Sequence, residues 1–82
     1  MEKIINTQGY KMIVKKEYTT ALKLLQANTV FFPNSANAWD SLGEVNMLAG
    51  DKAKSIKAYQ NALQLNPASA NAKKMLKKLQ KQ

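Results

Sequence analysis

The sequence predicts an all-α protein, a right-handed α-α superhelix of two helix-turn-helix repeats followed by one terminal helix. Three observations support this prediction. Only three glycines and two prolines occur in 82 residues, which leaves room for long helices. These breakers recur at a fixed offset, because the spacing from Gly9 to Gly43 equals the spacing from Pro33 to Pro67. Apolar residues also show the three- and four-residue spacing of helices buried on one face.

The first repeat is expected over residues 2–35. Its first helix presents a face formed by Ile4, Ile5, Gln8, Met12 and Ile13. Its second helix presents a face formed by Tyr18, Ala21, Leu22, Leu25 and Thr29. Lys16 lies at the expected turn of this repeat. Gly50 is its equivalent in the second repeat, because the two are separated by as many residues as Gly9 and Gly43.

The second repeat is expected over residues 36–69. Asn34 or Ser35 can cap its first helix, whose apolar positions are Trp39, Leu42, Gly43, Val45 and Met47. Gly50 supplies the left-handed residue that ends this helix, and Asp51 caps the next one. The apolar positions of that helix are Ala53, Ile56, Tyr59, Ala62 and Leu63, and it ends before Pro67. A capping helix over residues 70–81 has an apolar side formed by Ala72, Met75, Leu76 and Leu79.

The spacing of Trp39, Leu42, Gly43, Tyr59 and Ala62 resembles the tetratricopeptide repeat. That family's motif runs W-x-x-L-G-x-x-Y, followed by a small residue, an aromatic, an alanine and a proline. One copy of the motif is as long as the separation between Gly9 and Gly43. Residues 36–69 resemble it well, and residues 2–35 less well. The departures are Ile5 for the tryptophan, Gln8 for the leucine, Asn46 for the tyrosine and Lys16 for the turn glycine.

The resemblance implies a module that holds a partner protein or peptide on a concave surface lined by the first helix of each repeat. The side chains expected on that surface are Asn6, Tyr10, Ile13, Asn37, Asp40, Glu44, Met47, Asn71, Lys74 and Lys78. Asparagine suits such a surface because its amide both donates to and accepts from peptide backbone. The alternative is that these are ordinary exposed helix residues. Some members grip chaperone tails with a two-carboxylate clamp, but Asn6, Tyr10, Ser41, Asn71 and Met75 replace its residues here, so that mechanism is rejected.

The N-terminal end is expected to pack on something. Ile4, Ile5, Met12 and Ile13 offer more apolar surface than one neighbouring helix covers, which suggests a homodimer, contact with a parent domain or contact with a further repeat. The run from Phe32 to Glu44 is also similar to short repeat tails of bacterial hydrolases and esterases. That likeness raises the alternative of an accessory domain in a larger hydrolase.

Charge raises a further alternative. The net charge is +8, and residues 51–82 hold eight lysines against Asp51 alone. Lysines attract nucleic acid or an acidic surface in a salt-sensitive way. However, no arginine is present for bidentate recognition, and no aromatic lies among Lys73, Lys74, Lys77 and Lys78 to stack on a base. We expect no specific nucleic-acid binding, and a solvated face is the simpler interpretation.

The composition argues against catalysis. Histidine and cysteine are both absent, which removes the commonest general base and metal ligand and the thiolate ligands. No glycine-rich phosphate loop is present. Asp40 and Glu44 alone supply too few ligands to hold a metal cation. We therefore predict no enzymatic activity, cofactor or metal. No signal peptide or membrane-spanning stretch is recognisable, so the compartment stays open.

Overall fold

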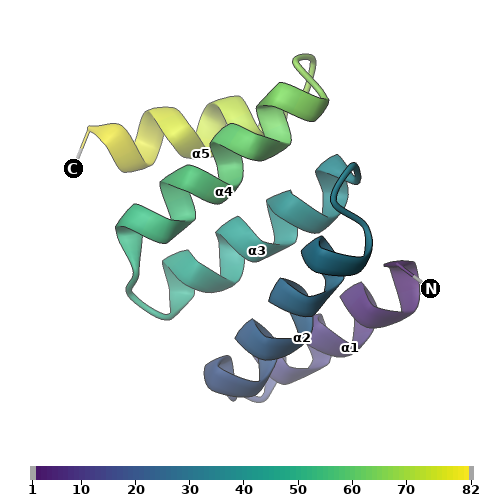
Figure 1. Cartoon of the computed structure of the whole chain (residues 1–82). Coiled ribbons are helices and arrows are strands. Elements are labelled where there is room, and N and C mark those ends of the chain that lie inside the picture. Colours follow the sequence, from purple (N-terminus) through teal and green to yellow (C-terminus); the bar gives the residue numbers. More distant parts are fainter. Residues whose placement is uncertain (1, 82) are drawn as a thin grey trace.

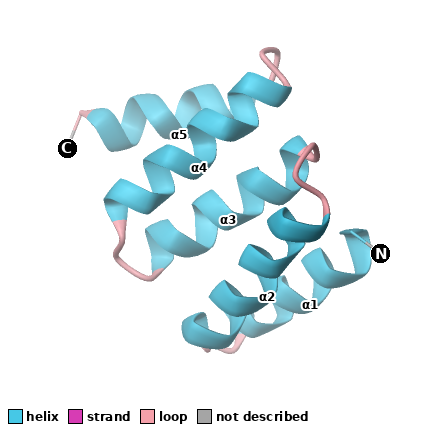
Figure 2. Cartoon of the chain, in the orientation of Figure 1, coloured by secondary structure: helices cyan, strands magenta, loops and turns pink. Residues whose placement is uncertain are grey.

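Five helices account for most of residues 2–81, the part of the chain that the computed structural model describes (Figure 1). They are α1 (Glu2–Val14), α2 (Tyr18–Phe31), α3 (Ala36–Leu48), α4 (Lys52–Leu65) and α5 (Ala70–Gln80). No strand occurs within that range, and short loops join the helices (Figure 2). None of these helices is both long and apolar enough to cross a membrane. The all-α prediction is confirmed.

The turns inside the two helix pairs are the same structure, displaced by one repeat length. After α3, Gly50 N–H donates to the Met47 carbonyl at 3.1 Å and Asp51 N–H donates to the Asn46 carbonyl at 2.8 Å. These two bonds form the Schellman motif, which requires a left-handed residue, and Gly50 has a φ of 87°. After α1, Lys16 takes the same role with a φ of 61°. The expectation that Lys16 replaces the turn glycine is confirmed.

The helix starts also follow the predicted chemistry. The Ser35 hydroxyl accepts from Ala38 N–H at 3.2 Å, which caps α3. The Asp51 carboxylate accepts from Lys54 N–H at 3.1 Å and caps α4 in the same way. Ser69, one repeat length after Ser35, forms the same cap at the start of α5.

Glycine lets the helices of each pair approach closely. A Cβ atom on Gly43 would lie 2.8 Å from the ring of Tyr59, and one on Gly9 would lie 2.5 Å from Leu25. Both distances are shorter than carbon atoms tolerate, so the space belongs to the facing side chain. The Ser55 hydroxyl, also buried, donates to the Gly43 carbonyl at 2.7 Å and ties α4 to α3.

Two clusters of buried side chains hold the five helices together. The first joins the two repeats and contains Ala21, Leu25, Leu42, Val45 and Ala58. The second joins α4 to α5 and contains Tyr59, Ala62, Ala72, Leu76 and Leu79. Trp39 packs against both clusters. The apolar side expected for the last helix is thereby confirmed.

The packed face of α1 differs from the expected one. Ile4 and Gln8 are exposed, whereas Gly9 is the buried residue of this helix. Met12 and Ile13 are partly buried against the first cluster, which leaves less apolar surface at this end than expected. The reason is that the close approach at Gly9 turns that side of the helix toward Leu25. The contact with a second copy or a parent domain stays a prediction. On α4, similarly, Ala58 is buried and Ala53 is exposed.

Candidate functional site

Hydrogen bonds join the expected groove residues of α3 to α1 and α5, the helices that occupy the equivalent place in the neighbouring repeat units. The Tyr10 hydroxyl of α1 donates to Glu44 Oε1 at 2.9 Å. The Asn71 amide of α5 donates to both carboxylate oxygens of Asp40, at 2.9 and 3.1 Å. At the start of α3, the Asn37 amide donates to Glu2 Oε1 at 3.1 Å. The structure thus brings six side chains of α1, α3 and α5 onto one surface, which we call the inner face.

The inner face is ordered by the repeat. Residues one repeat length apart occupy equivalent places on α1, α3 and α5 and form two rows. One row consists of Asn6, Asp40 and Lys74, and the other of Tyr10, Glu44 and Lys78. Each row therefore passes from a neutral side chain to a carboxylate and then to an ammonium group. A ligand lying across the helices meets negative charge over α3 and positive charge over α5.

Burial and mutual repulsion perturb the carboxylate at the centre. The pKa of Asp40 is raised chiefly by burial and further by the charge of Glu44, while the hydrogen bond from Asn71 opposes the rise. No lysine contributes to that shift. The ion pair between Lys54 and Asp51, with Nζ and Oδ2 3.9 Å apart, lies at the start of α4, away from this face.

The tyrosine hydroxyls near these acids stay protonated. Burial raises the pKa of Tyr10 to about 12, and the hydrogen bond to Glu44 and the nearby carboxylates add to the rise. A hydrogen bond with Ser41 acts in the opposite direction. Burial raises the pKa of Tyr59 as well, and the charges of Asp40 and Glu44 contribute. Both tyrosines are therefore hydrogen-bond donors at neutral pH.

The remaining expected residues lie in mixed surroundings. Asn6 is half-buried, and its Oδ1 atom is covered without a donor among the described residues. Ile13 and Met47 are partly buried against the first and second clusters, so each offers only part of its side chain to a ligand. Lys74 and Lys78 are exposed on α5.

Two polar residues of this surface were not among the candidates. Glu2 accepts from Asn37, and Ser41 bonds the Tyr10 hydroxyl. The position of Glu2 could have been predicted from the repeat. Lys3 is the first-repeat counterpart of Asn37, and Glu2 is the residue before it. Ser41 stands at one of the positions of the two-carboxylate clamp, but that signal was set aside with the clamp, and a buried serine on α3 resembles the small residues that only allow close packing.

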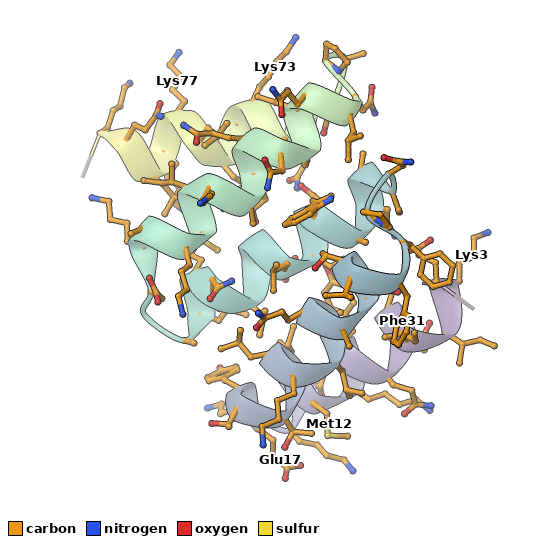
Figure 3. All side chains as sticks on the ribbon, viewed as in Figure 1. Lys3, Met12, Glu17, Phe31, Lys73 and Lys77 are labelled. Carbon is orange, nitrogen blue, oxygen red and sulfur yellow. The ribbon has the colours of Figure 1, made fainter. Side chains whose placement is uncertain are left out.

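The N-terminal face of the first repeat is mixed in character. On α3, Leu42 and Val45 pack against the first repeat, and their counterparts on α1 are Gln8 and Lys11. Both counterparts are exposed. Apolar groups remain at the margin, where Ile4 is 61% and Phe31 69% exposed. In Figure 3, Phe31 lies on the same side of the molecule as Lys3 at the start of α1.

Comparison with known proteins addresses the second helix pair. Residues 36–69 match the family model of the tetratricopeptide repeat. No curated protein matches the chain, so the expected likeness to tails of bacterial hydrolases receives no support. The matched range is the one expected for the second repeat, residues 36–69, and it comprises α3, α4 and the loop that follows. The match and the five helices of residues 2–81 together support a helical repeat protein of the tetratricopeptide type.

Proposed function

We propose that this chain is a protein-interaction module, not an enzyme, and that its inner face binds a peptide segment of a partner protein. Tetratricopeptide repeats generally mediate protein–protein interaction, and residues 36–69 match that repeat. The observation that supports the inner face is the pair Asp40 and Glu44. These two half-buried carboxylates lie one helical turn apart in a protein that is otherwise strongly basic.

The chemistry of the pair indicates what the partner supplies. Burial, and to a smaller extent the charge of Glu44, disfavour the ionised form of Asp40, and the hydrogen bond from the Asn71 amide offsets only part of that combined cost. The Tyr10 hydroxyl donates to Glu44. A lysine or arginine side chain of the partner, placed over α3, would lower the pKa of Asp40 and relieve the repulsion. Hydrogen bonds to charged groups contribute about 1.5–3 kcal/mol each when water is excluded.

The surroundings of the pair suit an extended peptide. The amides of Asn37 and Asn71 each donate to a carboxylate and keep their carbonyl oxygens as acceptors for backbone N–H groups. Lys74 and Lys78 occupy the same rows on α5 and favour an acidic residue at that end of the peptide. The preferred ligand therefore carries a cation followed by an anion along its length.

A peptide-selection experiment tests this proposal. The purified chain is used to select binders from a random peptide library, and the selected peptides are compared with those taken by the Asp40→Asn variant. We expect lysine or arginine to be enriched with the native chain and affinity for those peptides to fall by about tenfold in the variant, equivalent to about 1.4 kcal/mol.

Glu17→Gln is the matched control. It removes one carboxylate charge from an exposed residue between α1 and α2, outside the inner face, where its side chain makes no cap bond. Figure 3 shows Glu17 at the end of the molecule near Met12. Equal losses in both variants would mean that net charge, not the inner face, governs binding, and the proposal would then be wrong.

A further inference from the structure

A groove crosses the opposite side of the molecule, between α2 and α4, with α3 as its floor. Figure 1 shows α3 between these two helices. One cavity of about 200 Å³ is lined by Trp39 and Leu42 from α3, Gln26 from α2, and Lys57 from α4. A second cavity of about 190 Å³ is lined by Pro33, Gln64 and Leu65. Trp39 and Asn61 line both cavities, which makes them one continuous groove.

The groove runs along one stripe of α4. Lys54, Lys57, Asn61 and Leu65 lie three or four residues apart, so they face the same side of the helix. At 1.5 Å per residue, the stripe from Lys54 to Leu65 is roughly 16 Å long. An extended peptide covers that length with about five residues, at 3.3 Å each.

The chemistry changes along this length. Lys54 and Lys57 place two ammonium groups at one end, where Lys54 also forms the exposed ion pair with Asp51, and Pro33 and Leu65 make the other end apolar. Between them, Trp39 provides a partly buried aromatic surface whose Nε1–H is already bonded to the Pro33 carbonyl at 2.8 Å. No carboxylate lines either cavity. The charge of this groove is therefore opposite to that of the centre of the inner face.

Amide side chains supply the polar contacts. Gln26, Asn61 and Gln64 reach the groove from both walls, and each offers donors and an acceptor to a peptide backbone. Asn46 forms part of the floor, is 3% exposed, and lacks a donor for its Oδ1 atom among residues 2–81. That oxygen is itself covered by protein atoms, so the polar groups that a ligand in the groove can reach are the amides of Gln26, Asn61 and Gln64.

We infer that this groove, which we call the outer groove, is a second binding surface and that its occupant is an extended acidic peptide segment. The acidic residues of the segment lie at Lys54 and Lys57, and its apolar side chains lie over Trp39 and against Leu65. Its backbone is bonded by the amides of Gln26 and Asn61. The inference is independent of the inner face, whose centre at Asp40 and Glu44 favours a cation.

Tryptophan fluorescence gives a direct test, because Trp39 is the single tryptophan of the chain. The probe is a short blocked peptide whose first half is glutamate and whose second half alternates leucine with glycine. We expect its addition to shift the Trp39 emission in a saturable way that weakens as salt is raised. A peptide with lysine in place of glutamate is expected to bind at least about fivefold more weakly, since exposed ion pairs contribute about 0.2–1 kcal/mol each.

Two charge-reversal variants test whether the acidic peptide binds at the outer groove. Lys57→Glu should weaken binding of the acidic peptide about fivefold. Lys73→Glu makes the same charge change on α5, whose Lys73 points away from the rest of the molecule in Figure 3, and should leave binding nearly unchanged. Circular dichroism of both variants verifies that they remain helical.

Three results would overturn the inference: no saturable change in emission, equal binding of the acidic and basic peptides, or equal losses in Lys57→Glu and Lys73→Glu. The Asp40→Asn variant separates the two surfaces. It should bind the acidic peptide as the native chain does, whatever the outcome at the inner face.

Discussion

Asn28 provides the sharpest test of the packing. It is completely buried on α2, and neither its Nδ2 nor its Oδ1 atom has a hydrogen-bond partner within residues 2–81. Its counterpart in the second repeat is Ala62, which is also buried. We predict that Asn28→Ala stabilises the protein, although replacing a buried side chain by a smaller one ordinarily destabilises.

The magnitude follows from three contributions. A buried polar group without a partner costs about 1–3 kcal/mol, and the substitution removes that cost. Alanine also favours the helix over asparagine by up to about 0.7 kcal/mol. Against this, the smaller side chain leaves a cavity of roughly 25 Å³, which costs about 0.6 kcal/mol at about 24 cal/mol per Å³. The expected net gain is about 1 kcal/mol or more.

Thermal and urea denaturation followed by circular dichroism measure this gain. For a domain of this size, about 1 kcal/mol raises Tm by about 4–8 °C. The reverse substitution at the equivalent position, Ala62→Asn, is the control and should destabilise by about 1–3 kcal/mol. A loss of about 1 kcal/mol or more in Asn28→Ala would show that Asn28 makes a favourable polar contact, and the reasoning would fail.

Three further predictions concern the contact between α3 and α4 and the inner face. Gly43→Ala should destabilise by about 1–2 kcal/mol in urea denaturation, because overpacking against the Tyr59 ring outweighs the helix propensity gained; an unchanged midpoint would contradict the close approach. Tyr10 should ionise near pH 12, which the phenolate absorbance reports, whereas a pKa near 10 would mean that it is not buried beside Glu44. Because the folded pKa of Asp40 is raised, its ionisation costs stability as the pH rises through that pKa. Asp40→Asn should therefore stabilise the protein at neutral pH, and this gain should disappear below the ordinary pKa of 3.8; a gain that persists in acid would refute the assigned cause.

The repeat could be predicted because its signals are local. A glycine at a close approach, a left-handed turn residue and a proline after a helix each impose a backbone geometry, and one constant offset links them. Lys16 is an example. Its position in the repeat predicted a turn residue there, and it adopts the left-handed conformation although a lysine side chain disfavours it.

The packed side of α1 could not be predicted equally well. Apolar side chains suggested Ile4 as a buried residue, but Gly9, which has no side chain, decides which side of the helix faces Leu25. The burial of Asn28 was not predicted either. Asparagine is usually exposed, so its type gives no reason to expect it in the core.

The inner face was partly predictable. Helix positions identified Tyr10, Asp40, Glu44 and Asn71 as residues of one surface, and the structure joins them in pairs. The pairing itself depends on the distance between neighbouring helices, which no single segment specifies. The outer groove was not predicted, because its walls come from α2 and α4 and its floor from α3.

The most direct test of the central claim, that the inner face is the binding surface for a cationic peptide, is an NMR titration of the isotope-labelled chain. The ligand is a lysine-containing peptide taken from the selection experiment. We expect chemical-shift changes to concentrate at Tyr10, Asp40, Glu44 and Asn71 and to be small along α2. Shifts confined to the lysines of α5 or to the exposed end near Ile4 would contradict the claim.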